Sequence, residues 1–152
     1  MTAALGHLFK GNVPPVVPVA VPDATPRRCH AFGARLAALA SRGIMVVAFG
    51  ATVHQGEGAE GRRTDAKPPA FATEFDAWCA NLLSDGESGE LFAFGSRGPM
   101  AAQAHDAEGT YLRPLFVAMG AASLAERAVG FPLRGFEHGT ISRRCVQFGR
   151  NT

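Results

Sequence analysis

The sequence has few residues that build a covalent or metal framework, and no long apolar run. Its three cysteines, Cys29, Cys79 and Cys145, lie far apart and form no Cys-x-x-Cys pair. This spacing predicts neither a disulfide framework nor a local zinc motif, so we interpret them as small core residues in a reducing cytoplasm. The longest apolar runs, such as residues 44–53, are shorter than the roughly 18 residues of a transmembrane helix. The N-terminal residues lack a charged region followed by an apolar one, so we predict no signal peptide.

The chain also lacks an excess of charge of either sign. Lys and Arg number 15, Asp and Glu number 13, and the two signs are mixed along the sequence. No basic stripe of the kind that binds nucleic acid is present. The hydrophobic fraction of 47% and the length of 152 residues are typical of one globular domain with a sizeable core. The absence of Gly-x-Ser-x-Gly argues against a serine hydrolase of that type.

The most apolar stretch, residues 44–54, is typical of a buried strand that ends in a small-residue turn and a histidine, His54. In an open α/β sheet, ligands bind beyond the carboxyl ends of the strands. Histidine side chains in general titrate near neutral pH, and they can move a proton or bind a metal. His54 is therefore the first candidate for a catalytic or metal-binding residue.

Upstream of this stretch, the pattern predicts a helix and a further strand. Residues 13–21 have the branched side chains of a strand, but three prolines interrupt them and favour an edge position. Thr25-Pro26 is typical of a helix start, the apolar spacing that follows is helical, and Gly43 fits the C-terminal cap. Strand, helix and strand with short connections form a βαβ unit, so we expect two parallel neighbouring strands.

Downstream, the apolar spacing predicts two more helices. One is expected from about Pro69 to Ser84, and the other over the apolar positions from Leu112 to Met119. Between them, residues 95–109 are rich in small residues and are expected to form a loop that contains His105.

The tail predicts two further strands, at residues 128–131 and 139–148. All these elements together predict the α/β fold class. We expect a mostly parallel central sheet flanked by helices, as a single three-layer domain over residues 1–152.

Residues 56–61 formally match the dinucleotide fingerprint Gly-x-Gly-x-x-Gly. That motif binds a pyrophosphate where the glycines lie between a strand and a helix N-terminus. Here no apolar helix follows directly, and Glu57 and Glu60 would repel phosphate. We interpret the segment as part of a flexible loop.

The other histidines carry weaker signals than His54. His7 and His30 are expected to be solvated, and His105 is expected on the surface of its loop. His138 precedes a predicted strand, where a structural hydrogen bond is the simpler interpretation. No two histidines have the spacing of a local zinc motif, so a metal site would have to be assembled from residues far apart in sequence.

Four segments occur in a fixed order along the chain. They are Gly43-Ile44-Met45-Val46-Val47-Ala48-Phe49-Gly50-Ala51-Thr52-Val53-His54, residues 69–78, residues 111–121, and Gly135-Phe136-Glu137-His138-Gly139-Thr140-Ile141-Ser142. Together they resemble class III extradiol ring-cleavage dioxygenases, which form the LigB-like superfamily, in the branch of the bacterial and plant DOPA dioxygenases. The resemblance covers essentially the whole chain and is to the C-terminal half of the catalytic subunit.

The resemblance implies an oxidoreductase that opens an aromatic ring. In the family, a non-haem Fe(II), or Zn(II) in some structures, lies at the carboxyl ends of the strands and binds a catechol and then O2. The histidine that matches His54 is implied to act as the acid/base beside the catechol and to neighbour the metal. The implied metal ligands in this chain are His54 and His105, and the resemblance assigns no substrate-binding residue.

Two features depart from the family pattern. Family members are nearly twice as long, and their first two metal-ligating histidines lie in an N-terminal half that has no counterpart here. Tyr111 stands where the DOPA-type branch has a further histidine, and a neutral phenol is a poor ligand for Fe(II). His105, six residues earlier, either substitutes for that ligand or matches another family histidine in the same loop.

These departures leave three interpretations open. The chain is a truncated dioxygenase whose site is completed by a second chain or by ligands such as His105 and His138. Alternatively, it is a non-catalytic, degenerate homologue that acts as a binding or subunit-interaction domain. An unrelated small α/β metal-binding protein is disfavoured by four ordered matches. Because a missing half would leave sheet edge and apolar surface uncovered, we expect a homo-oligomer or a partner chain.

Overall fold

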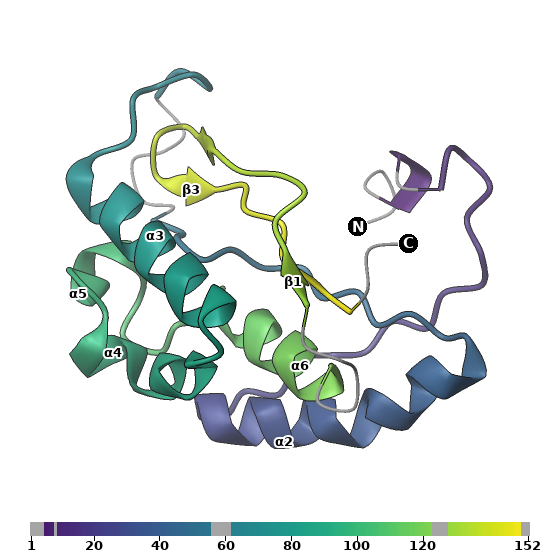
Figure 1. The fold of residues 1–152 in the computed structure, drawn as a ribbon. Helices are drawn as coiled ribbons and strands as arrows, with labels where there is room; N and C mark the ends of the chain where they lie inside the picture. The colour runs from purple at the N-terminus through teal and green to yellow at the C-terminus, as the bar shows by residue number, and fades with distance from the viewer. Residues whose placement is uncertain (1–4, 8, 56–61, 123–127, 150–152) are drawn as a thin grey trace.

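The structure is a computed structural model that describes residues 5–7, 9–55, 62–122 and 128–149. Among these described residues, helices make up most of the regular structure, and the short strands lie in the C-terminal tail (Figure 1). The elements are α2 (Pro26–Leu36), the 3-10 helix η1 (Ala37–Arg42), α3 (Ala70–Ser84), the 3-10 helix η2 (Ser88–Ala93), α4 (Phe94–Arg97), α5 (Ala101–Ala104), α6 (Arg113–Ala121), β1 (Val129–Gly130), β2 (Phe136–Glu137), β3 (Ile141–Ser142) and β4 (Gln147–Phe148).

The first predicted helix is confirmed at both ends. Pro26 occupies the first turn of α2, and Thr25 before it has an extended backbone, although its side chain makes no capping hydrogen bond. After Leu36 the helix tightens into η1, and Gly43 ends it with a left-handed φ of 72°. Glycine adopts that conformation without the steric cost that a Cβ brings, so Gly43 determines where the helix stops.

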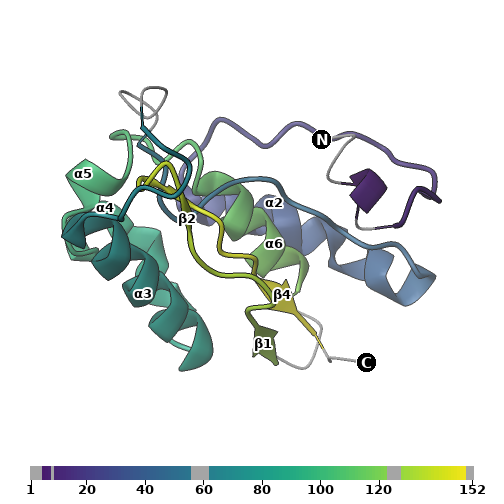
Figure 2. The same cartoon turned by 90° about the horizontal axis from the view of Figure 1, so that it is seen from above.

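Two glycines allow α2 and α6 to pack closely along one another, as both views show (Figure 2). A Cβ on Gly33 would lie 2.0 Å from the carbonyl oxygen of Val117. A Cβ on Gly120 would lie 2.1 Å from the carbonyl oxygen of His30. Because no heavy atom fits at those distances, only glycine at both positions permits this helix crossing.

The core forms between α3 and the segments that pack on it. The predictions of helices at 69–84 and after Leu112 are confirmed, since α3 and α6 cover these positions. The largest fully buried side chains are Phe75 of α3, Phe116 of α6, Leu91 and Leu112. Their burial connects three helices and the turn before α6 in one cluster.

The prediction of a loop at residues 95–109 is wrong for most of its first half. The chain there forms the end of α4 and then α5, each only four residues long. A helix of one turn is too short to show a repeating apolar face, so the sequence pattern misses it.

The strands of the tail pair in two small antiparallel sheets. In one, β1 pairs with β4, and Val129 lies opposite Phe148. In the other, β2 and β3 form a hairpin, with Phe136 opposite Ser142. The tail strands are therefore present, but the predicted strand at 139–148 is divided between β3 and β4.

The mixed helix and strand character is confirmed, but the predicted parallel central sheet does not form among the described residues. Residues 13–21 and 44–50 run in the same direction in both views, as a βαβ unit requires (Figures 1 and 2). No backbone hydrogen bond joins them, and both segments are largely exposed. The two segments are extended chain that has no strand partner within the described part of the protein.

The cysteines divide into two groups. Cys29 and Cys79 are buried and free, as predicted, whereas Cys145 is exposed, so its assignment to the core is wrong. Cys145 lies in the segment that connects β3 and β4. Within the described residues, no helix is long and apolar enough to cross a membrane.

Candidate functional site

His54 lies in a short turn that backbone hydrogen bonds hold from two sides. The backbone N–H of His54 donates to the carbonyl of Ala104 at 3.1 Å, and that of Gln55 donates to Thr140 at 3.1 Å. His54 also forms an isolated antiparallel bridge with Ile141 of β3. The turn is thus anchored both to α5 and to the C-terminal hairpin, which restricts where the His54 side chain can lie.

The His54 ring stacks on the ring of Tyr111. Their centroids are 3.4 Å apart, and the planes differ by 14°. The backbone holds the pair together, since Ala51 N–H donates to the carbonyl of Tyr111 at 2.9 Å. A Cβ on Gly50 would lie 2.4 Å from that same carbonyl oxygen, so the residue before the turn must be glycine. His54 is half-buried and Tyr111 is exposed, so the stack lies at the protein surface.

His105 is buried, and the prediction of a surface position for it is wrong. Its Nε2–H donates to the carbonyl of Thr52 at 2.5 Å, and the rings of Phe75 and Phe94 contact it edge-on. Burial lowers the pKa of His105 to about 4, because the charged imidazolium would lose its hydration. At neutral pH the ring is therefore uncharged, and Nδ1 carries its only lone pair available to a metal.

A buried charge network connects the His54 turn to α3 and β3. Asp76 of α3 is only 4% exposed and accepts hydrogen bonds from Thr52 Oγ1 at 2.5 Å and Ser142 Oγ at 2.7 Å. Arg144 donates to the same carboxylate through Nε at 3.0 Å and through a second, shorter contact. The Arg144 guanidinium also lies over the ring of Phe131. Both carboxylate oxygens of Asp76 therefore accept hydrogen bonds, and this network determines the position of Thr52.

Sequence reasoning missed this network, although one signal was available. Asp76 interrupts the apolar face of the second helix, next to Phe75, where a charged side chain has to find a partner or remain in water. Its partners Thr52 and Arg144 lie 24 and 68 residues away along the chain. No local spacing rule connects residues that far apart.

The remaining described histidines take no part in the His54 turn, and one of them, His138, contacts a backbone carbonyl. His138 has a positive φ of 53°, and its Nδ1 lies 3.0 Å from the carbonyl of Arg62, as the prediction of a structural hydrogen bond requires. His7 is exposed, and His30 is half-buried against Phe92, where burial lowers its pKa. The glycine-rich fingerprint lies outside the described residues.

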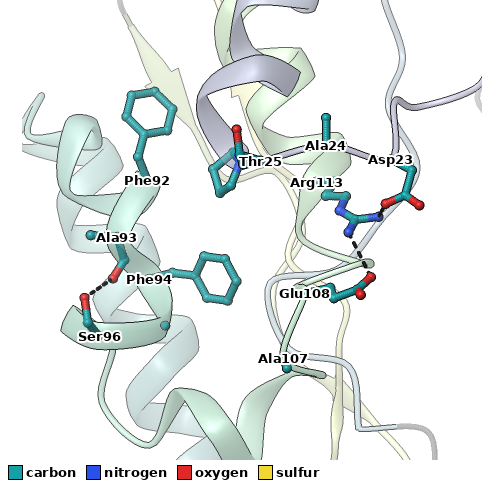
Figure 3. Close-up of a pocket in the computed structure, with 12 residues that line it drawn as sticks. Asp23, Ala24, Thr25, Phe92, Ala93, Phe94, Ser96, Ala107, Glu108 and Arg113 are labelled. Carbon is teal, nitrogen blue, oxygen red and sulfur yellow. Dashed lines mark hydrogen bonds and ion pairs between the residues drawn. The ribbon is translucent and has the colours of Figure 1, made fainter.

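A pocket of about 510 Å³ lies between η2, α4 and the start of α6 (Figure 3). Phe92 and Phe94 line it on one side, and Arg113 lies on the opposite side. The Arg113 guanidinium pairs with Asp23 at 2.7 Å and with Glu108 at 3.1 Å, so its charge is already offset. Neither predicted site histidine lines this pocket, so it is separate from the His54 turn.

The residues that the structure describes do not by themselves form a metal cage. They contain no group of three or more His, Cys, Asp or Glu side chains placed to hold one ion. His105 has its Nε2–H engaged, and Tyr111 offers a phenol stacked on His54. Catalytic zinc sites and 2-His-1-carboxylate iron sites use three protein ligands, and the described residues do not bring three such side chains together.

The arrangement of helices and the two small sheets defines a fold that a solved structure shares. The uncharacterized protein JW3007 from Escherichia coli K12 is similar, with a TM-score of 0.65 and 26% sequence identity. The match covers 83% of this chain and 51% of that chain, so this chain corresponds to about half of the length of its structural relative.

The family follows from the sequence of the same region. The family model described as the catalytic LigB subunit of aromatic ring-opening dioxygenase matches residues 5–146. This chain therefore belongs to the LigB family, as the resemblance implied. A comparison with curated proteins found no match.

Proposed function

We propose that this chain forms the His54-bearing part of an aromatic ring-opening dioxygenase that acts on a catechol, such as DOPA, with O2. Membership of the LigB family over residues 5–146 supports the reaction class. The observation that carries the assignment to a residue is the His54 turn. The His54 N–H donates to Ala104, the neighbouring Gln55 N–H donates to Thr140, and the half-buried His54 ring stacks on Tyr111. We propose the chain as the counterpart of the C-terminal half of a catalytic subunit and as a cytoplasmic protein.

His54 is proposed to accept the proton of a catechol hydroxyl. A catechol must lose protons before its two oxygens can chelate a metal, and imidazole is the side chain best suited to take one near neutral pH. The backbone hydrogen bond from His54 to Ala104 keeps the ring at the turn, and Tyr111 covers one of its faces. The other face and the ring edge are the surfaces left for a substrate.

The metal assignment stays a prediction. The family implies Fe(II) or Zn(II), which when bound supplies the open positions for catechol and O2. Of the predicted ligands, His105 would bind only through Nδ1, because its Nε2–H is engaged with Thr52. Further donors would have to come from outside the described residues, so we assign no reaction step to the metal.

Metal uptake and ring opening test the proposal directly. The purified chain would be loaded anaerobically with Fe(II), analysed for metal, and then given L-DOPA or protocatechuate and O2. We expect a yellow ring-opened product from wild type, or from wild type with its partner, and none from His54→Gln. His7→Gln is the matched control, because His7 is exposed and lies away from the turn.

Two results would contradict the enzyme proposal. One is failure to bind iron both alone and in the presence of a partner polypeptide, and the other is unchanged product formation by His54→Gln. Either result would favour the alternative function, a non-catalytic binding or subunit-interaction domain. Circular dichroism of each variant separates loss of activity from loss of fold.

A further inference from the structure

The pocket beside the start of α2 has one apolar wall, which the core holds in place. Phe92 and Phe94 form this wall (Figure 3). The ring of Phe116 packs against both, with centroids 5.7 Å from Phe92 and 6.4 Å from Phe94. The pocket volume of about 510 Å³ is typical of a site for a small molecule. The wall is thus formed before any ligand arrives, and it suits an apolar or aromatic group.

The opposite side of the pocket carries a buried cation, Arg113. Its side chain is only 11% exposed, and its guanidinium pairs with Asp23 and Glu108. The Nε–H of Arg113 is buried and has no hydrogen-bond partner among the described residues. A buried donor of a charged group that stays unsatisfied costs free energy. The two carboxylates therefore do not provide Arg113 with a full set of acceptors.

The first turn of α2 adds further hydrogen-bond donors beside the pocket. Thr25 and Pro26 line the pocket at this end of the helix, and the Thr25 side chain makes no capping hydrogen bond. The first turn contains no acidic residue. Free N–H groups at a helix N-terminus favour an anion. Arg113 and this helix end thus form an electropositive part of the pocket that suits a carboxylate.

Asp23 and Glu108 give the pocket solvent-exposed groups of the opposite charge. Their side chains are 87% and 70% exposed. Ion pairs with such exposed carboxylates contribute little to stability, so a ligand can compete for either partner. Among the described residues, the charged ones that line the pocket are these two and Arg113, which leaves one negative charge in excess. This excess favours a ligand that carries an ammonium group.

We propose that this pocket binds a free α-amino acid with an apolar or aromatic side chain. The carboxylate of the amino acid accepts hydrogen bonds from Arg113 and from the first turn of α2. Its ammonium group pairs with Asp23 and Glu108, and its side chain packs on Phe92 and Phe94. A ligand with only a carboxylate adds to the negative excess, and one with only an ammonium group brings Arg113 no further acceptor. A zwitterion suits both parts of the pocket.

This inference goes beyond the proposed function, because neither His54 nor His105 lines the pocket. Binding of an amino acid is measured without metal and without turnover. The outcome is therefore independent of whether the chain opens an aromatic ring.

Isothermal titration calorimetry of the purified chain with three related probes tests the proposal. The probes are L-phenylalanine, which carries both charges, 3-phenylpropionate, which lacks the ammonium group, and 2-phenylethylamine, which lacks the carboxylate. We expect saturable one-to-one binding of L-phenylalanine in the millimolar range or tighter. The other two should bind at least about tenfold more weakly, because each loses hydrogen bonds to charged groups.

Variants at the exposed carboxylates locate the site. The double variant Asp23→Asn with Glu108→Gln keeps hydrogen-bond acceptors for Arg113 and changes only exposed positions. It should weaken L-phenylalanine by at least about tenfold, because the ammonium group loses its charged partners. It should tighten 3-phenylpropionate, because no carboxylate then competes for Arg113. Each single substitution should give a smaller change of the same sign.

Glu74→Gln is the matched control, because Glu74 is exposed on α3 and does not line the pocket. It should leave the affinity for both probes unchanged. Circular dichroism shows that each variant is folded before its affinity is compared.

Three results would overturn the proposal. If neither L-phenylalanine nor L-leucine binds saturably in the millimolar range, the pocket takes no such amino acid. If 3-phenylpropionate or 2-phenylethylamine binds as tightly as L-phenylalanine, one of the two charged parts of the pocket is not used. If Glu74→Gln weakens L-phenylalanine as much as the double variant does, the binding site lies elsewhere.

Discussion

Residues 44–50 and residues 51–55 are neighbours in one apolar stretch, yet they have opposite environments. Residues 45–50 form no backbone hydrogen bond to a described residue, and Phe49 is 46% exposed. From Ala51 onward, four backbone hydrogen bonds join the chain to Tyr111, Ala104, and the C-terminal hairpin, and Val53 is fully buried.

Residues 44–50 are the more apolar of the two parts, since residues 51–55 include Thr52, His54 and Gln55. Composition alone would therefore predict the opposite pattern of burial, and the difference comes from the segments that each part meets. The second part meets α5, the start of α6 and β3, which this chain provides itself. The first part passes a region where the described residues offer no strand. The histidine turn is therefore held by other segments of this chain, whereas residues 45–50 form no backbone hydrogen bond with any described residue.

The largest effect is expected from removing the carboxylate that anchors the turn. Asp76→Ala leaves Arg144 buried and unpaired and removes the acceptor of Thr52 Oγ1. Breaking a buried ion pair from one side costs about 3–5 kcal/mol of unfolding free energy. Urea denaturation measures it. Asp65→Ala is the control, because its pair with Arg63 is exposed to solvent, and it should leave the free energy of unfolding nearly unchanged.

The protonation of His105 should loosen the same turn at low pH. Its pKa is about 4 when folded, whereas an unfolded histidine titrates near about 6.5. Between these values only the unfolded state binds the proton, so stability is present at pH 7 and is lost as the pH falls towards 4. The loss is about 3 kcal/mol.

Urea denaturation as a function of pH tests the His105 effect. In His105→Gln, which keeps an N–H for the Thr52 carbonyl, the free energy of unfolding should lack this decrease as the pH falls towards 4. His7→Gln should retain the decrease, because His7 is exposed. An unchanged slope in His105→Gln would show that other groups cause the acid sensitivity.

Two valines of the same stretch give the most direct contrast. Val53→Ala should destabilise the chain by about 2 kcal/mol, because Val53 is fully buried and the deletion leaves a cavity. Val47→Ala should change the stability by less than about 0.5 kcal/mol, because Val47 is 41% exposed. Equal effects in thermal and urea denaturation would mean that Val47 is covered in the isolated chain.

The boundary between the two regions should be sensitive to one added methyl group. Gly50→Ala would place its Cβ 2.4 Å from the carbonyl of Tyr111 and should cost about 1–2 kcal/mol through displacement of that backbone. Gly89→Ala, where no atom lies within 4 Å of the new Cβ, should be neutral or slightly stabilising. Thermal denaturation of the pair distinguishes crowding from a general effect of alanine.

The sequence was sufficient for features that depend on residues close together along the chain. Helical spacing located α2, α3 and α6, and Gly43 marked the end of the first helix. The ordered motifs led to the LigB family, which the match over residues 5–146 confirms. These signals are local, because caps and amphipathic faces repeat within a few residues.

The candidate site was only partly predictable. The end of the apolar stretch identified His54 as a candidate, but its stacking on Tyr111 and the anchoring through Ala104 were not visible in the sequence. His105 was expected on the surface, and only the packing of Phe75 and Phe94 shows that it is buried and uncharged. Small residues around His105 resemble a loop until the aromatic rings from other helices are in place.

The family, the three main helices and the histidine that ends the apolar stretch could all be predicted from patterns along the sequence. The tertiary structure alone decided that Asp76 holds Thr52, Ser142 and Arg144, since these partners lie 24, 66 and 68 residues away. It alone also decided that the apolar stretch is buried only from Ala51 onward. The physical reason is the same in both cases: burial and charge pairing depend on which distant segments meet, and no spacing along the chain encodes that meeting.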